Sequence, residues 1–126
     1  MAQYVDGFLI PVPTRKLPAY RRIAKVACKV WLDHGALDYR ECVGDDLNIK
    51  GVRPFAQAAA CKRGETVLFS WIAYRSRAHR DRVNALVMKD PRMKKFMDGR
   101  IPMPFDCKRM CYAGFSELVA GQRKRA

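Results

Sequence analysis

The sequence predicts one α+β domain in which four strands and two main helices follow in the order β-α-β-β-α-β. Four segments alternate or are rich in β-branched and aromatic residues, and two others carry apolar residues at intervals of three and four. A length of 126 residues with 49% hydrophobic residues suits a single core. We therefore expect residues 1–119 to form one domain and residues 120–126 to form a flexible basic tail.

The first half of the chain contains a strand, a helix and a second strand. Residues 4–12 (YVDGFLIPV) alternate as a strand does, and the prolines that follow remove ladder donors. Thr14 is a candidate N-cap for a helix that closes at His34-Gly35. Its apolar positions are Leu17, Tyr20, Ile23, Ala24, Ala27, Val30 and Trp31. Residues 36–44 predict the second strand, and residues 45–64 predict a long loop.

The second half repeats this pattern. Residues 65–74 (ETVLFSWIAY) give the clearest strand prediction of the chain. Ser76 is placed to cap a helix that runs to about Asp90, and Pro91 then starts a short helical turn that stops at Gly99. The predicted inner face of the longer helix is Ala78, Val83, Leu86 and Val87. Residues 108–119 predict the fourth strand.

This order of elements is the ferredoxin-like arrangement, an antiparallel four-stranded sheet with both main helices on one face. The other face is left uncovered. Strand alternation sends to it either Tyr4, Asp6 and Phe8 or their neighbours, and either Phe69 and Trp71 or Ser70 and Tyr74. Because an exposed aromatic face marks an interface, we predict a homodimer in which two such faces meet.

No segment has the features of a membrane span or a secretory signal. The longest apolar runs, such as residues 67–73, are much shorter than the roughly 20 residues that a spanning helix needs. The first residues, MAQYVD, lack a basic region followed by an apolar stretch. We therefore expect a cytoplasmic protein that makes no membrane contact.

Motifs for metals and cofactors are also missing from the sequence. The 5 cysteines have no CxxC spacing and predict free thiols; Cys107 and Cys111, if on one strand, would lie about 13 Å apart at roughly 3.3 Å per residue. The 2 histidines form neither HxH nor HExxH. GxGxxG, GxxxxGK[ST] and GxSxG do not occur. We therefore predict no metal and no cofactor.

Four ordered segments carry a family resemblance: YVDGFLIPVP at 4–13, YRECVGDD at 39–46, FSWIAYRSRAHRDRVNALVMKDPRM at 69–93 and MPFDCKRMCYAGF at 103–115. Together they resemble the YbaA-like family of uncharacterised bacterial proteins. The resemblance implies the dimeric α/β-barrel superfamily, in which two ferredoxin-like sheets face each other. That superfamily includes cofactor-independent monooxygenases, small isomerases and binding proteins, and the fold alone does not choose among them.

The first functional hypothesis is a homodimeric barrel that binds a small organic ligand in a cleft. The candidate cleft residues are Asp6, Phe8, Arg40, Trp71, Arg109 and Tyr112. Asp6 lies within an apolar strand, where a carboxylate needs a partner, water or a pocket. It is a candidate base or ligand anchor; the alternative is an ion pair with an arginine such as Arg40 or Arg109.

Other charged and aromatic residues have two interpretations each. His79 lies in the first turn of a helix, where the helix dipole favours a neutral imidazole, so it is either a candidate base or part of a solvated helix start. Trp71 either packs or lines a pocket for an aromatic ligand. The pairs Arg40-Glu41 and Lys108-Arg109 are explained by cross-strand ion pairing.

The second hypothesis is an accessory protein that binds RNA or another polyanion. The net charge is +13, and residues 15–29 carry basic charges only. The candidate phosphate contacts are Arg21, Arg22, Lys25, Lys29, Arg77 and Arg80. The alternative is a solvated basic surface, because the third strand, VLFSWIAY, lacks the aromatic pattern of RNA-recognition domains.

Overall fold

The computed structural model describes residues 2–124, in which one sheet is covered by helices on one side. The strands are β1 (Tyr4–Pro13), β2 (Asp38–Val43), β3 (Glu65–Tyr74) and β4 (Cys111–Ser116). The α-helices are α1 (Leu17–Asp33), α2 (Phe55–Ala58), α3 (Arg77–Lys89) and α4 (Pro91–Met97). Short 3₁₀ turns cover Thr14–Lys16 and Cys107–Arg109. None of the helices within residues 2–124 has the length and apolar character needed to cross a membrane.

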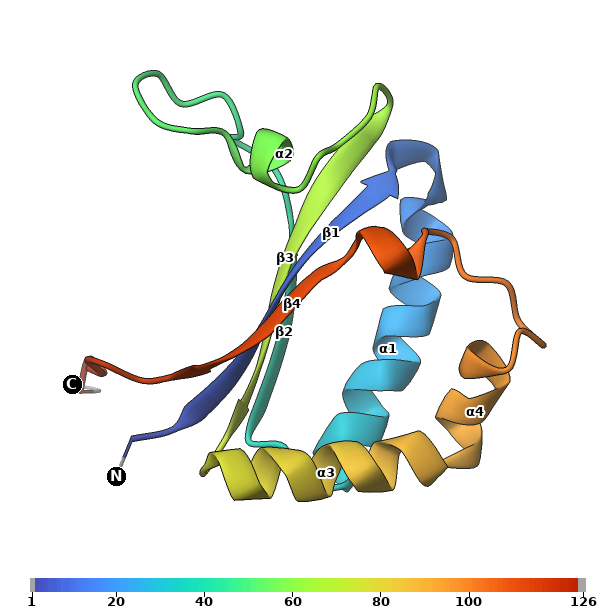
Figure 1. Cartoon of the computed structure of the whole chain (residues 1–126), viewed down its shortest axis with the longest axis vertical. Coiled ribbons are helices and arrows are strands. Elements are labelled where there is room, and N and C mark those ends of the chain that lie inside the picture. The colour runs from blue at the N-terminus through green and yellow to red at the C-terminus, as the bar shows by residue number, and fades with distance from the viewer. Residues whose placement is uncertain (1, 125–126) are drawn as a thin grey trace.

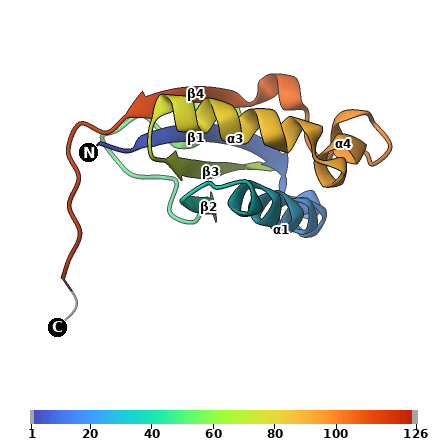
Figure 2. The same cartoon turned by 90° about the horizontal axis from the view of Figure 1, so that it is seen from below.

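The four strands form an open antiparallel sheet in the order β2-β3-β1-β4. Helices α1, α3 and α4 lie on one side of it, while the short α2 and its loop project on the other side (Figure 1). Viewed from below, α3 crosses in front of the strands, and α1 lies at the edge of the sheet formed by β2 (Figure 2). The sheet therefore has one covered face and one open face.

Strand register decides which side chains point to the helices. In the pairing of β1 with β3, Asp6 lies opposite Ile72 and Phe8 lies opposite Ser70. Ile72 and Ser70 are buried, and Asp6 is only 1% exposed. Of the two alternatives that the sequence left open, the even-numbered residues of β1 and β3 face the helices.

The core under the helices has two connected parts. One contains Val30 of α1, Ile72 and Tyr74 of β3, and Val83 and Val87 of α3. The other contains Ile10, Val12, Tyr20 and Leu68. The buried residues Tyr20, Ala27 and Val30 of α1 follow the helical spacing that the sequence predicted, so one stripe of this helix packs on the sheet.

The open face carries a row of aromatic side chains. Phe69 is 45% exposed and Phe115 is 56% exposed. Phe69 packs against Trp71 on one side, with ring centroids 5.7 Å apart, and against Phe55 of α2 on the other, at 5.8 Å. The aromatic open face is therefore Phe55, Phe69, Trp71 and Phe115.

Strand and helix boundaries partly follow the sequence prediction. The bounds of β3 and the Ser76 cap of α3, which accepts the His79 backbone N–H, are confirmed. The second strand begins later than predicted, at Asp38, because the Ala36 N–H bonds back to the Trp31 carbonyl after Gly35 takes φ 109°.

Two further predictions were wrong. The fourth strand does not begin at residue 108, because the Asp106 carboxylate accepts the Lys108 backbone N–H and starts a 3₁₀ turn there. Cys107 therefore lies outside the strand that holds Cys111. At its other end the strand stops at Ser116, and the predicted strand residues beyond it, Leu118 and Val119, are exposed.

The inner face of α3 also differs from the prediction. Val83 and Val87 are buried, but Ala78 and Leu86 are exposed, and His79 is buried instead. Positions 79, 83 and 87 form one i, i+4 row, and this row packs against the core.

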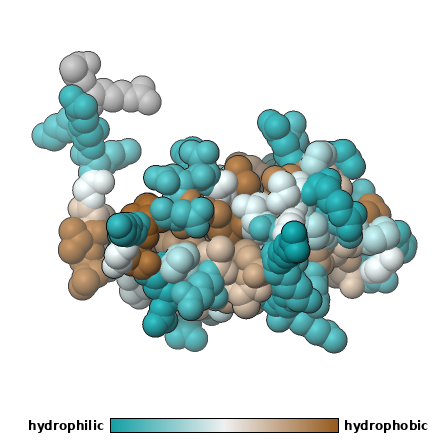
Figure 3. Space-filling model, turned by 90° about the horizontal axis from the view of Figure 1, so that it is seen from above, coloured by the Kyte–Doolittle hydropathy of each residue, from teal (hydrophilic) through white to brown (hydrophobic). Residues whose placement is uncertain are grey.

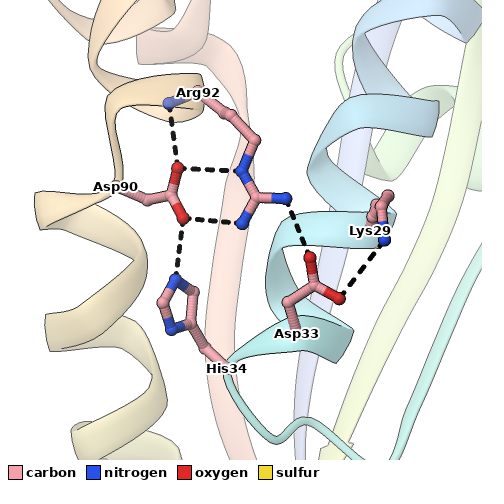
Figure 4. Close-up of polar contacts among 5 residues, drawn as sticks. All are labelled: Lys29, Asp33, His34, Asp90 and Arg92. Atoms are coloured by element: carbon pink, nitrogen blue, oxygen red, sulfur yellow. Dashed lines mark hydrogen bonds and ion pairs between the residues drawn. The ribbon is translucent and has the colours of Figure 1, made fainter.

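A polar cluster, the Asp90 clasp, joins the C-terminal end of α1 to the start of α4 (Figure 4). It consists of Asp33, His34, Asp90 and Arg92. The Arg92 guanidinium donates to Asp90 at 2.7 and 3.0 Å and to Asp33 at 2.8 Å, and His34 Nε2 lies 2.8 Å from Asp90. These contacts, with the Arg92 guanidinium first, hold the pKa of Asp90 well below its usual range.

We predict that Asp90→Asn lowers the melting temperature at pH 7 by a few degrees, because asparagine still caps α4 but cannot pair with Arg92. The pKa of Asp90 is lower in the folded chain than its ordinary value of 3.8, so this stabilisation is complete above that pH and is lost as the pH falls further. Thermal unfolding of both proteins between about pH 7 and about pH 2 should show the difference between them shrinking with acid.

Asp98→Asn is the matched control, because Asp98 pairs with Arg100 at the same spacing but on an exposed turn. Its melting temperature should stay within about one degree of the parent protein. Equal effects of the two substitutions would contradict a special role for the Asp90 clasp.

Candidate functional site

A cavity of about 410 Å³ lies between the covered face of the sheet and the helices. Binding cavities for small organic molecules have volumes of about 300–1,000 Å³. Its lining is mostly apolar and includes Phe8, Trp31, Met88, Met93 and Phe105. Methionine side chains adapt to irregular shapes, and aromatic rings supply large flat contact areas. The cavity is thus suited to a compact, largely apolar molecule.

The Glu41 carboxylate is one of two in the cavity wall. Alternation along β2 turns Glu41 and Tyr39 toward the helices. Tyr39 Oη donates to Glu41 Oε2 at 2.6 Å, Ser70 Oγ donates to Oε1 at 3.2 Å, and Tyr20 Oη also donates to Oε1. The Glu41 cluster, Tyr20, Tyr39, Glu41 and Ser70, thus brings three hydroxyl groups to one carboxylate.

The two tyrosines of the Glu41 cluster stay protonated at neutral pH. Burial, and then the negative charge of Glu41, raises the pKa of Tyr20 and of Tyr39 far above the ordinary phenol value. Each phenol is therefore a hydrogen-bond donor to the carboxylate and does not act as a base.

Asp6 is the second carboxylate of the cavity wall, and it has a cation beside it. Arg80 of α3 donates through Nη1 to Asp6 Oδ1 at 3.1 Å and to the Tyr112 hydroxyl at 2.7 Å. Its Nη2 lies 3.4 Å from the Tyr4 hydroxyl. Gly114, opposite Asp6 on β4, has no side chain, which leaves room for the Tyr4 ring.

Burial raises the pKa of Asp6, and the Arg80 guanidinium opposes this effect. A buried carboxyl group with a raised pKa, at the wall of a cavity, is able to exchange a proton with a bound molecule. The stacked rings of Phe8 and Tyr112, 5.0 Å apart, lie next to it on β1 and β4.

A second, larger hollow of about 980 Å³ runs along the outer flank of α1 beside β2. Its wall includes the basic side chains Arg21, Arg22 and Lys25 and the apolar Leu17 and Val43. It shares Tyr20, Tyr39 and Glu41 with the inner cavity. The Glu41 cluster therefore separates the inner cavity from the groove on the surface.

The residues predicted for a cleft between two facing sheets do not lie together in one subunit. Asp6, Phe8 and Tyr112 line the inner cavity on the helix side of the sheet; Arg40 borders it, but alternation along β2 turns its exposed side chain to the other face. Trp71 lies on the open face instead, in contact with Phe69. Arg109 is also away from the cavity, because it pairs with Glu65 at 2.7 Å and bonds the Ala60 carbonyl.

The charged residues of the strands have other partners than the sequence predicts. An arginine does pair with Asp6, but it is Arg80 and neither Arg40 nor Arg109. Arg40 instead pairs with Asp38 on its own strand, at 3.3 Å. The cross-strand ion pair expected for Glu41 is replaced by hydroxyl donors.

His79 is buried and is not at the cavity. Its Nδ1 accepts the Arg75 backbone N–H at 3.0 Å, and its ring packs edge-on against Tyr74. Burial, followed by the positive charges of Arg75 and Arg82, lowers its pKa. The lowered pKa and the acceptor role of Nδ1 both favour a neutral imidazole, and the bond to the Arg75 N–H closes the start of α3.

The residues proposed for polyanion binding differ in their exposure to solvent. Arg21, Arg22, Lys25, Lys29 and Arg77 are exposed. Arg80 is not, because its side chain is 14% exposed and engaged with Asp6. Of the basic tail, Arg125 lies outside the described residues. On the face seen from above, hydrophilic side chains are spread out with apolar ones between them (Figure 3).

Neither a metal centre nor a disulfide is formed by the described part of the chain. No group of three His, Cys, Asp or Glu side chains within residues 2–124 is arranged to hold a metal ion. All cysteines are free thiols: Cys28, Cys42, Cys61, Cys107 and Cys111.

Sequence patterns alone do not reveal the Glu41 cluster, because they place Tyr20 in the helix core and Glu41 in a cross-strand ion pair. A signal was available: Tyr39 and Glu41 are two apart on a predicted strand and therefore share a face. Which face that was, and that Tyr20 and Ser70 would meet it, depends on how α1 and β3 pack beside β2.

Known proteins match this sequence over most of its length. The model of the family described as "Protein of unknown function (DUF1428)" matches residues 3–107. "Uncharacterized protein YbaA" of Escherichia coli K12 is 43% identical over 117 residues, which cover 93% of this chain and 97% of that protein. The protein of the same name in Shigella flexneri has the same identity and coverage.

Among solved structures, "De novo designed protein Foldit4" aligns with 94% of this chain and 99% of its own, at 13% identity and a TM-score of 0.44. The family model covers β1, α1, the Glu41 cluster and Asp6 with Arg80, and the relatives align with most of the sequence. The chain therefore belongs to the DUF1428 family of proteins of unknown function and is similar to the uncharacterised bacterial YbaA proteins.

Proposed function

We propose that this protein binds a small, largely apolar organic molecule in the cavity between the sheet and the helices. The observation that carries the proposal is the cavity of about 410 Å³, whose apolar wall contains two carboxylates held in place by specific donors. Binding cavities combine an apolar lining with a few well-placed polar groups in this way. Asp6 and Glu41 supply those groups.

Filling the cavity should abolish binding without unfolding the protein. Ala27 of α1 is buried at the cavity wall, so Ala27→Leu places a larger apolar side chain inside it. A cavity-binding compound from a metabolite screen, at about a hundred times its dissociation constant, should stabilise the parent protein by roughly 2.7 kcal/mol in thermal unfolding. The Ala27→Leu variant should lose this shift.

Ala85→Leu is the control, because Ala85 lies on the exposed side of α3 and receives the same enlargement. It should keep the full ligand-induced shift. A broad screen in which no compound stabilises the parent protein would contradict the proposal.

We further propose that two copies pair through the aromatic open face, in a ferredoxin-like dimeric barrel. The strand order β2-β3-β1-β4 with all neighbours antiparallel fits that arrangement. Phe69 and Phe115 are about half exposed on the uncovered side, where contact with a second sheet would remove them from water. A stable interface of this kind buries about 1,200–2,000 Å² in total.

Phe69→Lys should therefore convert a dimer to a monomer, because burying an unpaired ammonium at the interface costs several kcal/mol. Sedimentation or light scattering measures the mass directly. Leu86→Lys is the control, since Leu86 is 48% exposed on α3, away from the sheet. A parent protein that is monomeric at micromolar concentration would rule out the dimer.

A second candidate function is polyanion binding along α1. Arg21, Arg22 and Lys25 are exposed and lie together on the wall of the outer groove. Within residues 2–124 none of the three forms an ion pair with an acidic side chain. Such a group of cations is able to neutralise phosphates.

If this function is present, RNA affinity should fall linearly on a log–log plot against salt, with a slope of about −0.7 per phosphate neutralised on a single strand. The double variant Arg22→Glu/Lys25→Glu should abolish binding. Lys62→Glu/Arg63→Glu makes the same charge change in the exposed loop before β3 and should leave most of the RNA affinity. No binding by the parent protein at low salt would eliminate this candidate.

A further inference from the structure

The two carboxylates of the cavity differ in their charge balance. Asp6 is paired with the Arg80 guanidinium at 3.1 Å. Glu41 has no such partner: within residues 2–124, no lysine or arginine nitrogen lies at ion-pair distance from it. Arg40, its neighbour in sequence, pairs with Asp38 and has a side chain 62% exposed. The negative charge of Glu41 is therefore met only by neutral hydroxyl groups.

The Glu41 carboxylate also retains an open acceptor position. A carboxylate has about four lone-pair sites on its two oxygens. Oε1 accepts from Tyr20 and Ser70, whereas Oε2 accepts from Tyr39 alone. One site on Oε2 is left for a donor from outside the chain. Because Glu41 lines both the inner cavity and the outer groove, a bound molecule in either hollow is within reach of it.

The rings near Glu41 also suit a cation. Trp31 and Tyr39, with centroids 6.1 Å apart, and Tyr20 and Phe105, 5.5 Å apart, all line the inner cavity. The faces of aromatic rings attract cations, and the attraction grows when the cation leaves water. A half-buried carboxylate without a counter-ion, among aromatic faces, is complementary to a protonated amine that carries an apolar group.

We propose that the ligand of this cavity is a small apolar amine whose ammonium group donates to Glu41 Oε2. This inference rests on the proposed small-molecule function and names its ligand class. Two of the three hydroxyl donors, Tyr20 and Tyr39, have a raised pKa and stay protonated, so they hold the carboxylate in place without neutralising it. The exposed cations of α1, Arg21, Arg22 and Lys25, line the outer groove but not the inner cavity, which is where we place the amine.

The test compares three probes of similar size and different charge: 2-phenylethylamine, 2-phenylethanol and phenylacetate. Binding is measured by calorimetry and by the fluorescence of Trp31, which lines the cavity. We expect the amine to bind at least about tenfold more tightly than the alcohol, because both can donate to the carboxylate but only the ammonium adds the attraction of an opposite charge. Phenylacetate should bind most weakly. Preference for the alcohol or the acid would overturn the amine assignment while leaving small-molecule binding in place.

The Glu41→Gln variant should bind the amine and the alcohol with affinities within about threefold of each other, because it keeps the shape and removes the charge. Glu117→Gln is the control, since it makes the same change at a carboxylate outside the cavity lining, which accepts the Gln3 backbone N–H, and it should retain the tenfold preference. An amine preference that survives Glu41→Gln would overturn the role of Glu41. Failure of all three probes to bind or to stabilise the parent protein would count against the inference and the proposed function together.

Discussion

The register between β1 and β3 decides which side chains form the interior of this protein. It pairs Asp6 with Ile72 and Phe8 with Ser70, and so turns these four residues toward the helices. A shift by one residue would exchange them for the side chains of the open face. Asp6 would then lose Arg80, and a buried carboxylate without a partner is costly. The cavity, its two carboxylates and the aromatic open face therefore all depend on this pairing.

Helix α1 connects the parts of the covered layer. Near its start, Tyr20 reaches the Glu41 carboxylate; near its end, Trp31 Nε1 donates to Asn84 of α3 at 3.1 Å. Its last residues continue into the Asp90 clasp, which holds the start of α4. The same helix carries exposed cations on its outer flank. Its inner side thus builds the cavity while its outer side forms the wall of the groove.

Electrostatic pairing explains why Glu41 stands apart. Several other carboxylates, among them Asp6, Glu65, Asp90 and Asp98, each have an arginine beside them. Glu65, for example, has a pKa lowered to about 2, first by its hydrogen bonds to Arg109. In a chain with a net charge of +13, cations are abundant. The carboxylate held by neutral hydroxyl groups is therefore a local property of the cavity wall, which the overall composition does not explain.

Local patterns in the sequence were sufficient to predict β3 and the Ser76 cap of α3, since these depend on residues close in the chain. They also marked Asp6, Phe8 and Tyr112, but for a cleft between two sheets, whereas these residues line the cavity under the helices. Tertiary structure decided the rest: Asp6 meets Arg80 from 74 positions away, and Glu41 meets Tyr20 from 21 away. Alternation determines that residues share a face, but only the packing of helices on one side determines which face is buried and which distant groups meet there.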